Sequence, residues 1–570
     1  MKNWLLFFIL FIKLINGWSQ NAETNRIKVE HADNYSFQIN GKDQVQTLFG
    51  HVVMSHNEAV LHCDSAIILN ESQVEANANI VITQGDSVTI YADQLNYNAE
   101  TETAKLLGNV VLVSDNKKLF TSSLTYQLNT KVAEYKVRSS IQTDSIVLSS
   151  ESGIYWVNNK EAHFYSEVYV EHEDFQLFSD TVRYNFDIEV ASFLGPSIFI
   201  TKDSTNLYAE GGSYDQKIQF ASFFDNAIYT DSIRIAQADS ILYWQLDQKT
   251  YLSGNASIWE ADRQISGDSI YIDQLNKQFN AKGSAQVIDQ SQVISAYEIR
   301  LDDILGRGWA TGEVNWVDTS AGMRISCDTA HLTNHGLSIQ AYNQSFSRPL
   351  LALDMEGDTL YLGADTLFAI SQVDSSNKDT IRTFLAFHDV RIFKSDLQLI
   401  CDSLEYSEKE ERFSFYEKPI LWSDTSAFYG DSIFMFLLDK TVDHLELSGN
   451  GFMINSADEI LFNQIKGRVI DILFLEGDIH KVKVNGNAET IYYVLDEENA
   501  YIGVNQSSSS NMVIQFKEGE VDAIKNYNEV ESYFIPIQEA DQEVLKLEGF
   551  RWDNTNRPNG IFSLITTKRL

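Results

Sequence analysis

A pattern of eight residues recurs along this chain about every 29 positions, a spacing typical of repeat architectures. Its eight positions are, in order, apolar, any, small, Asp, any, apolar, any and apolar, as in residues 61–68. Each repeat is expected to be one supersecondary unit that buries its apolar face on its neighbours. The clear copies place the aspartate at Asp64, Asp93, Asp180, Asp239, Asp268, Asp328, Asp365, Asp402 and Asp431.

The parity of the apolar residues changes inside this pattern. Side chains on one face of a strand recur at every second position, so Ile90 and Ala92 share a face, but the next apolar pair is Leu95 and Tyr97. This slip at Asp93 predicts a bulge or corner. We therefore interpret the nine aspartates as structural corner residues that accept hydrogen bonds from backbone donors freed by the break. A calcium loop and a catalytic role are the alternatives.

Pairs that begin with glycine recur at the same spacing, as in Gly108-Asn109 and Gly254-Asn255. Because Gly and Asn tolerate positive φ, they predict tight turns between strands, with room for about three strands in each repeat. Aromatic residues make up 12% of the chain and only 5 residues are Pro, which favours strands. We predict an all-β fold, an elongated repeat array of antiparallel strands.

The first residues predict export. Residues 1–3 include one lysine, residues 4–15 are rich in Leu, Phe and Ile, and Gly17 and Ser19 precede a cut before Gln20. This layout is typical of a secretory signal peptide, which we predict over residues 1–19. An uncleaved anchor is the alternative, but the apolar run is shorter than the ~20 residues that a spanning helix needs.

Charge and cysteine content narrow the class of protein. The formal net charge of −37 argues against nucleic acid as a partner, because nucleic-acid binding needs a basic footprint. Cys63, Cys327 and Cys401 each occupy the small position of the repeat pattern. We expect buried free thiols there, with a disulfide or a metal site as the minor alternative, and we predict no metal and no cofactor.

The spacing of the repeat pattern becomes irregular between residues 337 and 390, and again after residue 466. We therefore predict a β-repeat domain over residues 20–345, a second β-repeat segment over 346–500 that continues the array, and a divergent capping segment over 501–570. Residues 539–547 are the best candidate for a helix after the signal peptide.

The motif in residues 92–97, followed by Gly108-Asn109-Val110, resembles the OstA/LptA-type family of lipopolysaccharide transport domains. The resemblance covers residues 50–334 most clearly, and the chain's length is similar to that of the long OstA-like proteins of the Bacteroidetes type. It implies a partly open β-jellyroll, or β-taco, whose apolar interior holds the acyl chains of lipopolysaccharide in the periplasm. It also implies partners of the same type, joined by edge-strand pairing. Self-association and attachment to the outer membrane are left open.

The residues predicted to line this lipid groove are the inward apolar positions of three repeats. They are Ile90, Leu95, Tyr97, Leu177, Val182, Tyr184, Ile265, Ile270 and Ile272. The alternative for each is a place in a closed core. We expect no catalytic residues, because the sequence contains no Walker loop, Gly-x-Ser-x-Gly or His-Glu-x-x-His motif. A structural or adhesive scaffold that binds protein or glycan, and a β-helical polysaccharide-degrading enzyme, are the rival functions.

Overall fold

The computed structural model describes residues 26–334, 338–344, 347–355, 357–373, 380–496, 498, 500–517 and 520–566. The predicted signal peptide, residues 1–19, lies outside these ranges. The chain divides into two compact units, residues 1–223 and 224–570. The predicted all-β antiparallel fold is confirmed. No helix in the described ranges is long and apolar enough to span a membrane.

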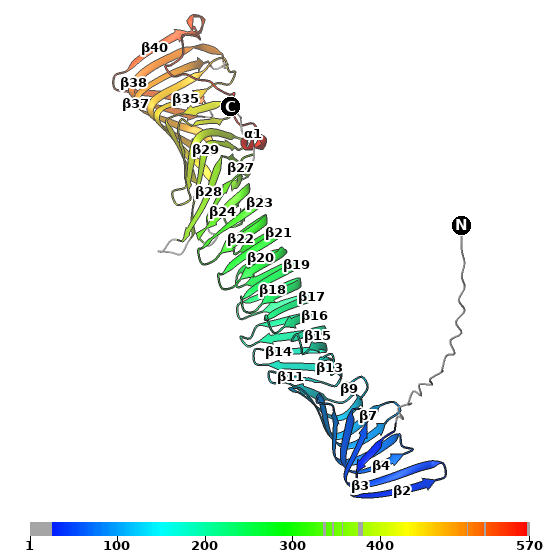
Figure 1. Cartoon of the computed structure of the whole chain (residues 1–570). Helices are drawn as coiled ribbons and strands as arrows, with labels where there is room; N and C mark the ends of the chain where they lie inside the picture. Colours follow the sequence, from blue (N-terminus) through cyan, green and yellow to red (C-terminus); the bar gives the residue numbers. More distant parts are fainter. Residues whose placement is uncertain are drawn as a thin grey trace, which may run out of the picture. The chain divides into compact units, whose positions relative to one another are not determined.

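The first unit is a stack of antiparallel strands, which Figure 1 shows side by side from β3 to β16. Both β1 and β2 pair with β3, and each later strand pairs with its neighbours in the chain or across a corner. The strands are β1 (Lys28–His31), β2 (Asn34–Asn40), β3 (Asp43–His56), β4 (Ala59–Leu69), β5 (Gln73–Gln84), β6 (Val88–Asn98), β7 (Thr103–Ser114), β8 (Lys117–Gln127), β9 (Val132–Tyr135), β10 (Ser139–Gln142), β11 (Ile146–Ser150), β12 (Ser152–Trp156), β13 (Glu161–His172), β14 (Phe175–Asn185), β15 (Val190–Thr201) and β16 (Asn206–Asp215).

Every long strand contains a corner near its middle. Between β5 and β6, Asn77 pairs with Gln94 and Ile80 with Ala92, so two residues of β5 face one residue of β6. The two residues of β5 at this bulge, Ala78 and Asn79, both have positive φ. A bulge of this kind bends the strand, so each strand contributes one half to each of two arms.

The 29-residue repeat is one pair of corner-bent strands rather than three strands. The glycine-led pairs do not form the predicted turns between strands, because Gly108 and Asn109 lie in the middle of β7. The turns lie elsewhere, for example at residues 57–58 and 99–102. The prediction was wrong because positive φ serves the corner as well as it serves a turn.

We call the strand halves that end at turns such as residues 57–58 arm A, and those that end at turns such as 99–102 arm B. The two rows of turns are lip A and lip B. Alternate side chains of both arms point into the space between them, the interior, and are buried. Phe175 of arm A lies 4.6 Å from Tyr214 of arm B between ring centroids, so the arms pack face to face.

The second unit repeats this arrangement. Its strands are β18 (Arg234–Trp244), β19 (Lys249–Glu260), β20 (Arg263–Asp273), β21 (Gln278–Asp289), β22 (Gln292–Asp302), β23 (Arg307–Asp318), β24 (Met323–Thr333), β25 (Ser338–Tyr342), β26 (Leu350–Met355), β27 (Asp358–Gly363), β28 (Thr366–Val373), β29 (Thr380–Phe393), β30 (Leu397–Ser407), β31 (Arg412–Tyr416), β32 (Ile420–Ser423), β33 (Ser426–Tyr429), β34 (Ser432–Leu438), β35 (Thr441–Asn455), β36 (Asn463–Leu475), β37 (Asp478–Leu495), β38 (Tyr501–Lys517), β39 (Glu520–Tyr527) and β40 (Glu531–Pro536). The strand β17 (Phe220–Thr230) contains the division between the units.

The irregular spacing of the repeat pattern after residue 337 has a local cause. Strand β24 pairs with β25 in one arm and with β26 in the other, and the loop that joins β25 to β26 contains Arg348 and Pro349. This corner is longer than the others, so the spacing changes while the antiparallel pairing continues. The predicted solvated loop at residues 374–379 lies outside the described residues.

The C-terminal tail packs on the outer face of arm A. Leu545 and Leu547 join a buried cluster with Trp422 and Ile454, and the Leu547 amide donates to Gln464 Oε1 at 2.9 Å. The helix expected over residues 539–547 is wrong, because the amides of Val544 and Leu545 close a single turn on the Asp541 carbonyl and the chain then extends along the sheet. Helical turns occur at η2 (Ile537–Glu539) and α1 (Ile561–Ile565), and α1 lies beside β27 (Figure 1).

The predicted buried free thiols are confirmed. Cys63, Cys327 and Cys401 are free and buried. Burial raises the pKa of Cys63 to about 11 and that of Cys327 to about 12. These thiols are therefore protonated and unreactive at neutral pH.

Candidate lipid-binding interior

All nine predicted groove residues are buried, and each is at most 8% exposed. They lie on three strands, with three residues each on β6, β14 and β20, so each group lines its own part of the interior. The structure does not bring the nine residues together into one site.

Aromatic side chains that the sequence interpretation missed fill the interior of the first unit. The rings of Phe175, Phe199 and Tyr214 lie 4.6 to 5.1 Å apart between centroids. Phe199 and Phe164 are fully buried. The interior here is therefore a packed core, which is the alternative stated above for each groove residue. Their alternation with exposed residues could have indicated them, but they lie outside the aspartate pattern.

Hydrogen bonds join the two lips of the first unit near the tight turns. His56 Nδ1 lies 2.6 Å from the Tyr97 hydroxyl, and Asn57 donates to Glu102 at 2.8 Å. In the next repeat, Gln84 Nε2 donates to the Leu128 carbonyl at 2.8 Å. Each contact joins residues of lip A and lip B that are 41 to 45 positions apart. The lips are thus latched by side chains, while the sheet hydrogen bonds run along each arm.

In the second unit, ion pairs also join lip A to lip B. Arg263 beside lip A forms a fork with Asp303 of lip B, with N···O distances of 2.9 and 2.8 Å. Burial by itself would lower the pKa of Arg263, but hydrogen bonds to Asp303 and Glu260 raise it. Farther along, Arg382 Nε donates to the buried carboxylate of Asp318 at 3.0 Å. Both pairs hold the lips together.

The interior opens at the C-terminal end of the second unit. A cavity of about 380 Å³ lies between the arms there. Met453 and Ile465 line it from arm A, and Phe474, Ile514 and Phe516 line it from arm B. These residues lie in register with inward residues of earlier strands, so the cavity is part of the same interior. Such a volume falls in the range of small-molecule sites.

The predicted corner aspartates lie on the outside of the bends. Asp93 accepts hydrogen bonds from the backbone and side-chain nitrogens of Asn109, both at 3.0 Å. A Cβ atom on Gly108 would collide with the Asp93 carboxylate, so this corner requires glycine. Asp64, Asp239 and Asp431 accept from Asn79, Asn255 and Asn450, while Asp180 and Asp268 face Gly195 and Gly283; Asp328, Asp365 and Asp402 lie beside Asn343, Arg348 and His388.

His172, Glu173 and Asp174 form a compact group of metal-ligand type within the described residues. Both imidazole nitrogens of His172 already have partners, because Nδ1 accepts from the Asp174 amide at 3.1 Å and Nε2 lies 3.0 Å from Gln216 Nε2. Gln216 belongs to lip B, so this group acts as another latch between the lips.

Comparisons with known proteins agree with the family resemblance. The model of the OstA-like protein family matches residues 24–180, and that of the LptA and LptD N-terminal LPS transport domain matches residues 148–279. The search of curated proteins found no match. One solved structure is LptH, the LptA-homologous periplasmic component of the lipopolysaccharide transport device of Pseudomonas aeruginosa. It is 12% identical over 27% of this chain and 81% of its own, with a TM-score of 0.14.

The two matching models overlap over residues 148–180 and together cover residues 24–279. Residues 24–279 therefore match the models of the OstA/LptA-type family of lipopolysaccharide transport domains.

Proposed function

We propose that this protein is a non-enzymatic carrier that binds the acyl chains of lipopolysaccharide in the periplasm and passes them toward the outer membrane. The observation that supports this most is the apolar interior between the two arms, which opens into the cavity lined by Met453, Ile465 and Phe516. Burying an acyl chain there is favourable by ~0.8 kcal/mol for each methylene group removed from water. No charged site is needed for that affinity.

We also propose that partner domains of the same type add to the exposed edge strand β2. In the described part of the chain, β2 pairs only with β3. Tyr35, Phe37 and Ile39 share one face of β2 and are 58%, 46% and 64% exposed. An unpaired edge with apolar side chains is a template for β-augmentation by a partner or by a second copy.

Site-specific photo-crosslinking in living cells tests the carrier function. Replacing Tyr97, Tyr184 or Phe516 with a photoreactive phenylalanine analogue keeps an aromatic ring in the interior. Exposed aromatic residues on the same strands as Tyr97 and Tyr184, namely Tyr91 and Phe178, serve as matched controls. We expect lipopolysaccharide adducts at the interior positions and none at the controls. Adducts at neither set, with the protein folded and exported, would contradict the proposal.

A structural scaffold is the second candidate, and the packed aromatic interior of the first unit favours it. A scaffold needs no ligand between its arms. The two candidates differ in the crosslinking result, because a scaffold should give protein or glycan adducts at exposed positions and no lipid adducts inside.

A further inference from the structure

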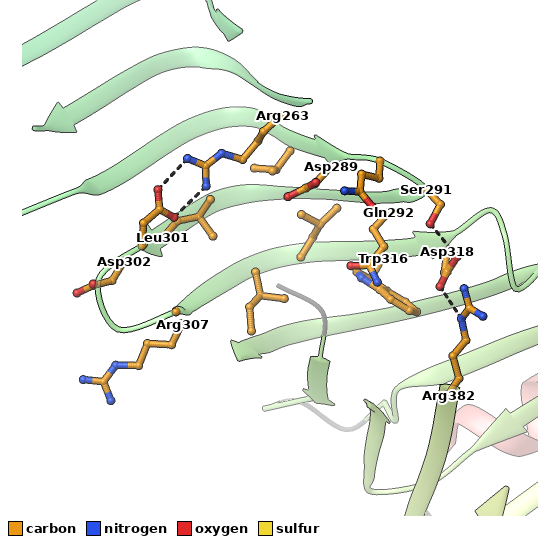
Figure 2. A pocket seen from close by; sticks show the side chains of 16 residues that line it. Arg263, Asp289, Ser291, Gln292, Leu301, Asp302, Arg307, Trp316, Asp318 and Arg382 are labelled. Carbon is orange, nitrogen blue, oxygen red and sulfur yellow. Dashed lines mark hydrogen bonds and ion pairs between the residues drawn. The ribbon is translucent and has the colours of Figure 1, made fainter. Parts of the chain in front are cut away.

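A second cavity interrupts the lips of the second unit between the two ion pairs. It has a volume of about 280 Å³ and is bounded by the Arg263–Asp303 pair on one side and the Arg382–Asp318 pair on the other (Figure 2). Ser291 of lip A donates to Asp318 at 3.4 Å and borders the opening.

The walls of this cavity belong to the apolar interior. Val287, Ile294 and Trp316 line it from arm A, and Leu301 and Leu332 line it from arm B. Val287, Ile294 and Trp316 are direct neighbours across consecutive strands and are buried. The opening therefore leads from the surface to the space between the arms. Its volume lies just below the ~300 Å³ at the lower end of small-molecule sites, which fits one acyl chain better than a whole lipid.

The charges on the rim select the kind of head group. Four lining residues are aspartates and three are arginines, and Arg263 and Arg382 already bind carboxylates. The carboxylate of Asp289 has no hydrogen bond or ion pair with any described residue, and burial raises its pKa by more than the charge of Arg263 lowers it. A half-buried acceptor without a partner is costly, and a donor group on a ligand would relieve that cost.

We propose that this opening is a side port for one acyl chain of an amphiphile whose head group donates hydrogen bonds to Asp289. Sugar hydroxyl groups or an ammonium group meet this requirement. A phosphate head group does not, because it would face an acidic rim on which Arg263 and Arg382 already bind carboxylates, while Arg307 is exposed and points away from the opening (Figure 2). The port rests on the carrier function proposed above, and it adds to that function a place of entry or exit and a preference among head groups.

Photo-crosslinking of the purified full-length chain tests the port. A photoreactive phenylalanine analogue replaces Trp316, and the probes are a decyl glycoside, decylammonium and decyl phosphate below their micelle concentrations. We expect the glycoside and the ammonium probe to give at least ~10-fold more adduct than the phosphate, which corresponds to a difference of about 1.4 kcal/mol in binding. Equal or greater labelling by the phosphate, or no labelling by any probe, would overturn the proposal.

Two variants assign the preference to one carboxylate. Asp289→Asn should abolish the advantage of the ammonium probe over the phosphate, while Asp302→Asn should keep it, because Asp302 already accepts from the Leu305 amide and from Gln278. Equal effects of the two variants would also overturn the proposal. Lipopolysaccharide adducts at Tyr97 and Phe516 without probe adducts at position 316 would reject the port alone. Their absence as well would reject the carrier function.

Discussion

The interior of the first unit and the C-terminal end of the second unit are built on the same corners but are filled differently. In the first unit, Phe175, Phe199 and Tyr214 meet between the arms, and side chains latch the lips. At the C-terminal end the strands are longer, 18 residues in β37 and 17 in β38, and a cavity of about 380 Å³ remains between the arms. The corner fixes how the strand bends, whereas side-chain size and arm length decide whether the interior is full.

The largest effect is expected from emptying the filled interior. Phe199→Ala should lower the free energy of unfolding by about 3–5 kcal/mol, because the removed ring leaves a cavity in a packed core. Chemical denaturation followed by circular dichroism measures this loss. Ile198→Ala, at a neighbouring position that is 44% exposed, is the control. If both variants lost the same small amount, the first unit would not have a packed interior.

The corners should behave alike in both regions. Gly108 and Gly449 have positive φ and face Asp93 and Asp431, so Gly→Ala at either position should cost about 2–3 kcal/mol through backbone strain and collision. Gly85 and Gly477 also have positive φ but open space around the Cβ position, and their Ala variants should cost only about 1 kcal/mol. Thermal unfolding of the four variants provides the comparison. A larger loss at Gly85 than at Gly108 would show that the carboxylate contact is irrelevant.

The ion pair beside the side opening should respond to acid. Burial raises the pKa of Asp318, but hydrogen bonds from Ser320 and Arg382 outweigh this and hold it below its ordinary value. The pair therefore stabilises the fold at pH values above the ordinary pKa of an aspartate. This stabilisation should be lost as the pH falls from about 5 to about 2.

Asp318→Asn should cost about 1.5 kcal/mol at neutral pH and should flatten that part of the pH dependence of unfolding. Glu313→Gln, at an exposed carboxylate of the same strand, is the control. A pH profile of Asp318→Asn that matches the unchanged protein would contradict the role of the pair.

The smallest effect on stability is expected in the open cavity. Phe516 is only half-buried, so Phe516→Ala should cost about 1 kcal/mol of unfolding free energy, far less than Phe199→Ala. The same change should weaken lipopolysaccharide binding by the purified chain, because it removes part of the apolar wall. Calorimetric titration measures the binding. Unchanged affinity would mean that the cavity is not where acyl chains bind.

The repeat pattern was sufficient to predict the all-β antiparallel fold and the place of the corners. The corners could be predicted because the change in parity at Asp93 arises from residues that are close together in the sequence. It did not predict the contents of the interior, since residues such as Phe199 and Gln84 act through partners far along the chain. The prediction of a helix near Leu545 was wrong for the same reason. This segment is held by residues far away in the sequence: Leu545 lies in a buried cluster with Trp422, and its carbonyl accepts a hydrogen bond from Gln464.

The carrier account depends on one movement, because acyl chains can enter the latched part of the interior only if the lips separate. Spin labels on cysteines introduced at Glu58 of lip A and Thr101 of lip B report their distance, and the three native cysteines are buried. A pair at Glu58 and Asp86, both on lip A, is the control. Added lipopolysaccharide should lengthen the distance between the lips and leave the control unchanged. Bound lipopolysaccharide with an unchanged distance between the lips would contradict the account.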